Sequence, residues 1–88
     1  MVRYRLPEPG ALGTPVRFDH FLIVYHRASG QTHMLAEPVP EILEALAEGP
    51  GDAATISHRL ATRFDGVEVD QVAAHLAELA ELGLVDAA

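Results

Sequence analysis

The sequence contains no cysteine and no lysine among its 88 residues. Without cysteine, disulfide bonds, thiolate metal sites and cysteine nucleophiles are excluded. Long apolar runs are also lacking, because the longest, residues 21–25, is far too short to span a bilayer. No apolar stretch follows Arg3 and Arg5 near the N-terminus, so we expect no signal peptide. Together these absences predict a cytoplasmic protein with no membrane partner.

Charge is unevenly distributed along the chain. Residues 1–36 hold four arginines and two acids, a charge of +2, whereas residues 37–88 hold two arginines and eleven acids, a charge of −9. The whole chain therefore carries −7 at neutral pH. An acidic half of this kind repels phosphate backbones, so no nucleic-acid partner is expected. Solvated helix faces are the simplest explanation of this acidic charge.

The N-terminal part of the chain carries strand and turn signals. Proline and glycine recur in residues 1–16, which indicates an extended or loop lead-in with a short strand at residues 2–6. Residues 17–26 are rich in aromatic and β-branched side chains and predict one central strand with apolar groups on both faces. Residues 27–30, RASG, then predict a turn into a second strand at residues 31–36.

Helical periodicity begins after the prolines at positions 38 and 40, and apolar residues recur three and four positions apart in three stretches. The first helix is expected to end in the stretch EGPGD, whose Asp52 is suited to cap the second. The second is expected to end at about residues 65–66, and the third to run from near Glu68 to a stop at Gly83. Residues 84–85 follow as a short terminal strand.

Strands followed by helices predict a single α+β domain over residues 1–88. We expect an N-terminal hairpin or three-stranded sheet and then three helices, in a winged-helix-like arrangement. Three short helices cannot bury all their apolar stripes on one another in so small a chain. The hairpin is therefore expected to cover the remaining apolar surface.

His26 and His33 flank the predicted turn, which raises the question of a metal or catalytic site. His20 and His26 would share one face of a strand but lie roughly 20 Å apart, too far for one ion. His26 and His33 supply no third ligand, whereas zinc normally takes three or four. Thr32 and His33 are neighbours on a strand and point to opposite faces, so they form no nucleophile–base pair. We therefore expect structural or surface histidines, no metal, no cofactor and no catalytic residues.

The order of elements also suits a winged helix-turn-helix, in which a helix enters the major groove of DNA. The candidate recognition helix, residues 68–82, has four acids and neither arginine nor lysine. Because phosphate contacts supply most nucleic-acid affinity, this composition argues against DNA. A winged-helix DNA-binding regulator remains an alternative on the fold alone.

Residues 31–35 form a candidate edge strand, with alternating polar and apolar side chains and no proline to block pairing. Small side chains at Ala73, Ala77 and Ala80 of the third helix would leave a groove beside it. This arrangement suits β-augmentation, in which a peptide adds a strand to the sheet. Two questions stay open: whether the lead-in covers this edge, and whether His33 lines the edge or packs beneath it.

The stretch FLIVYHRASGQTHML at residues 21–35 resembles the PqqD-like peptide chaperones, most of all a subgroup associated with an HPr-kinase-related protein. The family pattern continues with EILEALAEGP at residues 41–50 and HLAELAELGLVD at residues 75–86. The resemblance covers residues 17–86. Each motif is weakly specific alone, and their order within a short chain carries the resemblance.

The resemblance implies a compact relative of the winged helix, with three strands, three helices and no catalytic activity. Such a domain binds the leader of a ribosomally synthesised precursor peptide and presents it to a modifying enzyme, here of radical type or related to HPr kinase. The peptide adds to the third strand and lies against the third helix. A protein–protein assembly module of a larger complex is a further alternative. The implied peptide-binding residues are Arg27, Gln31, Thr32, His33, Met34, Leu35, Val72, Ala73, Leu76 and Ala80.

Leader peptides of such systems are often acidic, and the resemblance therefore carries an expectation about charge. The N-terminal half of the chain carries +2, and Arg27 lies close to the hairpin, which suits an acidic leader. The acidic third helix departs from this pattern, so an acidic leader is not expected to lie directly along it.

Overall fold

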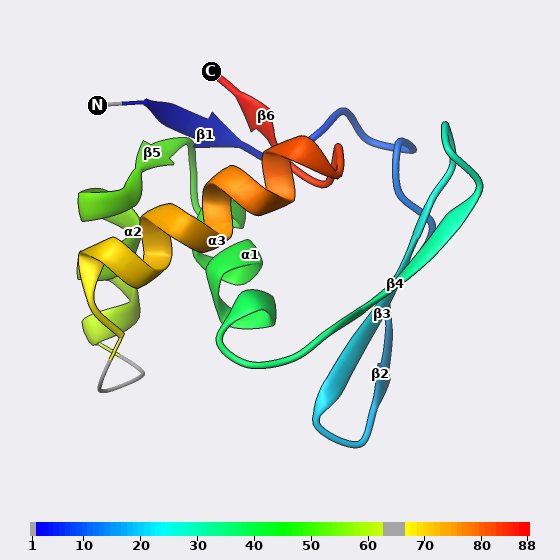
Figure 1. Cartoon of the computed structure of the whole chain (residues 1–88), viewed down its shortest axis with the longest axis horizontal. Helices are drawn as coiled ribbons and strands as arrows, with labels where there is room; N and C mark the ends of the chain where they lie inside the picture. The colour runs from blue at the N-terminus through cyan, green and yellow to red at the C-terminus, as the bar shows by residue number, and fades with distance from the viewer. Residues whose placement is uncertain (1, 63–66) are drawn as a thin grey trace.

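The computed structural model describes residues 2–62 and 67–88. Most strands precede the helices, which confirms the predicted α+β class (Figure 1). The predicted turn at residues 27–30 and the strand that follows it are both present. In chain order the elements are β1 (Arg3–Arg5), β2 (Val16–Phe18), β3 (Phe21–His26), β4 (Gln31–Leu35), α1 (Val39–Ala47), β5 (Gly51–Asp52), α2 (Ala53–Ala61), α3 (Val69–Glu81) and β6 (Asp86–Ala87).

β2, β3 and β4 form an antiparallel sheet with β3 in the centre. The chain reverses at Asp19 and His20, where Phe18 pairs with Phe21 and Asp19 takes a positive φ of 56°. The single strand predicted over residues 17–26 is therefore wrong, although its apolar part does form the central strand. Aspartate tolerates the left-handed backbone that the turn requires, but a two-residue loop without glycine or asparagine gives a weak sequence signal.

The lead-in before β2 pairs with β3 beyond the end of β2. Gly13 N–H donates to the Tyr25 carbonyl at 2.8 Å, and Arg27 N–H donates to the Ala11 carbonyl at 3.1 Å. Residues 11–13 thus lie on the β2 side of the sheet. The possibility that the lead-in covers the outer edge of β4 is therefore contradicted.

A second antiparallel sheet has the order β5–β1–β6. Tyr4 of β1 pairs with Gly51 on one side and with Ala87 on the other, so both ends of the chain lie side by side (Figure 1). The short strand predicted near the N-terminus is confirmed. The predicted terminal strand is shifted, because residues 84–85 are buried in the core and β6 begins at Asp86.

The helix ends follow the predicted capping signals. Asp52 precedes α2, and its Oδ1 accepts the Thr55 N–H at 2.8 Å. Glu68 precedes α3 as its N-cap, and Gly83 follows its last turn with a φ of 79°. The predicted end of the second helix, at residues 65–66, lies outside the described residues.

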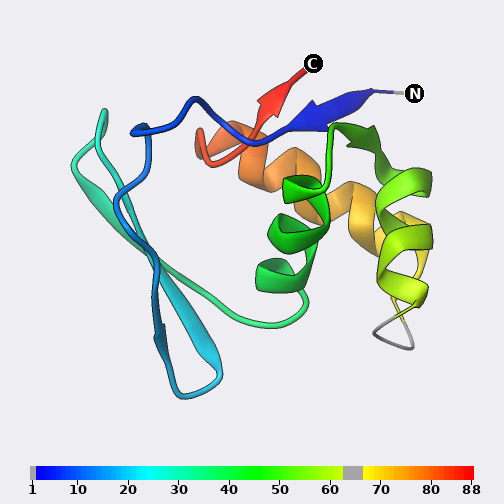
Figure 2. The same ribbon diagram turned by 180° about the vertical axis from the view of Figure 1, so that it is seen from behind.

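The helices and the β2–β3–β4 sheet share one hydrophobic core. Val24 of β3 and Leu35 of β4 are buried in it, so the sheet attaches to the helices through a single face (Figure 2). Across residues 2–62 and 67–88, no helix has the length and apolar character needed to cross a membrane. The buried core consists of Val24, Leu35, Ile42, Ala45, Leu46, Ala53, Ile56, Leu60, Val72, Leu76, Leu79, Leu84 and Val85.

Candidate functional site

β4 lies at the edge of its sheet, and the hydrogen-bond pattern fixes which of its backbone groups face outward. In an antiparallel pair, the N–H and C=O of one residue point to the same side, and successive residues alternate. The Tyr25 carbonyl accepts a hydrogen bond from Gly13 of the lead-in, so the backbone N–H and C=O of Tyr25 point away from β4. The backbone groups of the preceding residue, Val24, therefore point toward β4. His33 pairs with Val24 and therefore bonds inward. The backbone groups of Thr32 and Met34 consequently face outward, where no described segment pairs with them.

The same register settles the direction of the His33 side chain. Directly opposed residues in a sheet project their side chains to the same face. His33 opposes Val24, which is buried against the helices, and His33 is itself half-buried with an Nε2 atom that has no hydrogen-bond partner among the described residues. His33 thus packs beneath the strand. The exposed side chains of Thr32 and Met34 project from the other face.

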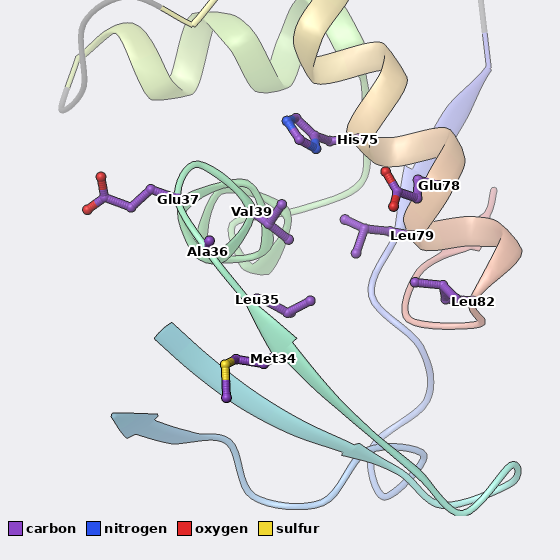
Figure 3. A pocket seen from close by; sticks show the side chains of 9 residues that line it. All are labelled: Met34, Leu35, Ala36, Glu37, Val39, His75, Glu78, Leu79 and Leu82. Carbon is purple, nitrogen blue, oxygen red and sulfur yellow. The ribbon is translucent and has the colours of Figure 1, made fainter. Parts of the chain in front are cut away.

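A groove of about 220 Å³ lies between the end of β4 and the C-terminal half of α3 (Figure 3). Its apolar part combines Leu35 and Val39 on one side with Leu79 and Leu82 on the other. In Figure 3 the side chains of Leu79 and Leu82 point from the helix toward Leu35. The residues that line the groove are Met34, Leu35, Ala36, Glu37, Val39, His75, Glu78, Leu79 and Leu82.

The predicted site residues of the hairpin fall into two groups. Met34 and Leu35 line the groove, and Thr32 is beside them on the open edge. Arg27 and Gln31 are exposed at the opposite end of the hairpin, Arg27 in the turn and Gln31 at the start of β4. The strand therefore brings only its C-terminal part to the groove.

The predicted residues of α3 do not line this groove. Val72 and Leu76 are completely buried in the core, and Ala80 packs against it. Ala73 lines a different hollow, next to Tyr4 of β1. The groove is instead lined by the helix face that carries His75, Glu78, Leu79 and Leu82.

One signal in the sequence marks this second helix face. Leu79 and Leu82 are three residues apart, which places them close together on a helix, yet Leu82 does not fit the stripe that ends at Leu79. In the structure Leu79 is buried and Leu82 is 39% exposed. A leucine outside the buried stripe of α3 indicates a second apolar surface beside that stripe. The spacing of the leucines in the sequence does not show which other element borders this surface.

Two glutamates, Glu37 and Glu78, belong to the lining of the groove. Glu78 lies on the α3 side with His75 next along the helix, whereas Glu37, after β4, directs its carboxylate away from the groove (Figure 3). Glu41, one turn into α1, has a pKa raised above its usual range, first by burial and then by repulsion from Glu37 and Glu44. The local potential at this end of the sheet is therefore negative. A ligand side chain placed beside Glu78 is favoured when it is apolar or cationic.

No protein-family model matches the chain, and no curated protein and no solved structure matches it significantly. Among the described residues, no group of three or more histidine, aspartate or glutamate side chains is arranged to hold a metal ion.

Proposed function

We propose that this protein is a non-catalytic peptide-binding domain of PqqD type. It binds the leader segment of a ribosomally synthesised precursor peptide in the cytoplasm and presents it to a modifying enzyme. The observation that supports this function best is the pair of outward-facing residues, Thr32 and Met34, on an open strand edge beside an apolar groove. The resemblance of residues 17–86 to PqqD-like chaperones supplies the class of peptide and of enzyme.

The bound peptide continues the β2–β3–β4 sheet as a fourth strand. Thr32 and Met34 together offer two N–H donors and two C=O acceptors to the incoming backbone. Each such bond contributes about 0.5–1.5 kcal/mol net, which is modest, so side-chain contacts must add to the affinity. Alternate side chains of an added strand point to one face, and here that face meets the groove over Leu79 and Leu82.

The groove also sets the side chains that the leader needs. Two aliphatic or aromatic residues at alternate positions fit against Leu35, Leu79 and Leu82. Acidic residues at these positions are disfavoured by Glu78. An acidic leader is compatible with binding only when its acids project away from the groove.

An NMR titration tests this function directly. The probe is a synthetic peptide that spans the N-terminal half of a short precursor encoded beside this gene. We expect its addition to shift the amide signals of Thr32, Met34 and Leu82 most strongly. Shifts confined to α1 and α2, or no shift with any such precursor, contradict the proposal.

Two variants of Met34 separate the backbone contribution from that of the side chain. Met34→Pro removes the outward N–H without breaking a bond to β3, and we expect it to abolish binding. Met34→Val keeps the N–H and suits a strand, so binding should weaken only slightly. Circular dichroism of both variants verifies that the domain still folds. Equal affinity of the two variants for the peptide contradicts strand addition.

The two alternative functions predict different results. A winged-helix regulator would shift a DNA fragment in a gel, although the exposed face of α3 carries Asp70, Glu78 and Glu81 and no cation. An assembly module would retain a large protein partner in a pull-down and ignore the precursor. Binding of the precursor, with neither of these results, supports the leader-binding function.

A further inference from the structure

The β2–β3–β4 sheet has a second face, which we call the outer face and which points away from the helices in both views (Figures 1 and 2). Directly paired residues share a face, so the register assigns its members without ambiguity. The opposite face carries Val24 and Leu35 into the core. The outer face consists of Val16, Phe18, Phe21, Ile23, Tyr25, Thr32 and Met34.

The outer face is apolar and largely open to solvent. Val16 is 57% exposed, Phe18 65%, Tyr25 43% and Met34 62%. Six of its seven side chains are large and apolar or aromatic, the seventh is Thr32, and none carries a charge. Taking about 150–250 Å² for each large side chain, the four exposed residues alone present roughly 450 Å². This area matches the largest apolar patch of a typical monomeric protein, and such patches are often functional.

We propose that the outer face is the interface of a homodimer, in which two sheets pack face to face. Two copies of this patch bury roughly 1,000 Å² together once its half-buried members are included, which is the size of a weak or transient interface. Sheets pack in this way at about 10 Å through interdigitated side chains. An interface of this size is of the weak and reversible kind, so we expect the dimer to dissociate on dilution.

Charge favours a second copy as the occupant. The chain carries −9 in residues 37–88, and the three helices formed there lie on the other side of the sheet (Figure 1). Two copies therefore meet through their uncharged faces, with the acidic parts held apart. Asp19 precedes β3 and Arg27 follows it, so these charges mark opposite ends of the sheet. A two-fold axis across the strands places Arg27 of each copy near Asp19 of the other.

Sedimentation equilibrium of the full chain without peptide tests the dimer, with a matched pair of valine variants. Val16→Lys places a charge in the outer face, whereas Val2→Lys makes the same change at 54% exposure beside β1. We expect Val16→Lys to weaken dimerisation by at least tenfold and Val2→Lys to leave it unchanged. Phe18→Asp, a second outer-face variant, should reproduce the effect of Val16→Lys if the latter folds poorly.

The possible results separate this interface from others. A wild-type chain that stays monomeric up to about 1 mM overturns the proposal, since even weak specific contacts form there. If the dimer persists in Val16→Lys but is lost in Met34→Pro, the two copies pair through the β4 edge. That result also overturns the proposal of an outer-face dimer. Arg27→Gln should weaken the dimer several-fold at low salt; a stronger dimer would contradict the two-fold arrangement. Because Val16 lies two strands away from the peptide edge, Val16→Lys should still bind the precursor.

Discussion

Gly83 and His26 lie against each other where the end of α3 meets the end of β3. A Cβ atom added at Gly83 would lie 3.0 Å from His26 Nε2, and Gly83 has a φ of 79°. The His26 ring is held from its other side by a 2.6 Å hydrogen bond between Nδ1 and Ser29 Oγ. This contact joins the hairpin to the end of α3, next to Leu82, which lines the candidate groove.

Replacing Gly83 tests this contact. Gly83→Ala suffers both a left-handed backbone and a clash, and we expect it to destabilise the protein by about 2–4 kcal/mol. Gly10→Ala is the matched control, because Gly10 also has a positive φ but an added Cβ meets nothing within 4 Å, so the loss should be about 1 kcal/mol. Urea denaturation measures both values. In the double variant His26→Ala/Gly83→Ala the clash is absent; a strictly additive result contradicts the contact.

Leu76 and Leu82 separate a structural from a binding role on α3. Leu76→Ala leaves a cavity in the core and should destabilise the protein by about 2–5 kcal/mol. Leu82 is 39% exposed in the groove, so Leu82→Ala should reduce stability by less than about 1.5 kcal/mol and weaken precursor binding several-fold. Thermal denaturation and peptide titration by calorimetry distinguish the two. Unchanged binding in a folded Leu82→Ala variant argues against the groove as the peptide site.

Asp52 predicts how stability changes in acid. Hydrogen bonds from Thr55 lower the pKa of Asp52 below its ordinary value of 3.8. An acid whose pKa is lowered in the folded state stabilises the protein at pH values above its ordinary pKa. This stabilisation is lost as the pH falls through the lowered pKa. Asp52→Asn keeps the cap but cannot titrate, so the unfolding midpoint should depend less on pH below 4. Asp52→Ala should lower the midpoint at neutral pH; no decrease would contradict the capping role.

The part of the site that could be predicted from sequence is the strand edge. Alternation in QTHML and the RASG turn define β4 through neighbouring residues alone, and Met34 and Leu35 do reach the groove. The helix face could not be predicted in the same way. The stripe of Val72 and Leu76 identifies what α3 buries, but the sheet beside it is positioned by long-range contacts such as Gly83 with His26. Their separation of 57 residues leaves no local pattern to read.

The second sheet shows the same limit. β5 and β6 have two residues each, too few to display an alternating pattern. They become strands because β1 lies between them and supplies backbone partners, as Tyr4 does for Gly51 and Ala87. Capping signals are local and were predictable, as at Asp52 and Gly83. The pairing of strands that lie far apart in the sequence depends instead on the hydrophobic core that the elements share.

Glu41 predicts a pH dependence of the opposite sign to that of Asp52. Burial, followed by repulsion from Glu37, raises its pKa above the ordinary value of 4.5, and its Oε2 is buried without a hydrogen-bond partner among the described residues. A raised pKa means that the folded state favours the protonated acid. The protonated acid therefore contributes its whole stabilisation at pH values below the ordinary pKa, and this stabilisation is lost as the pH rises through the raised pKa.

Neutralising Glu41 should therefore stabilise the protein at neutral pH. We expect Glu41→Gln to raise the unfolding midpoint at pH 7 and to leave it nearly unchanged at pH 4, where wild-type Glu41 is mostly protonated. Glu8→Gln, an exposed change of equal charge in the lead-in, is the control for net charge alone. Thermal denaturation at both pH values measures the difference. If Glu8→Gln stabilises the protein as much as Glu41→Gln, the effect comes from net charge and not from the partly buried carboxylate of Glu41.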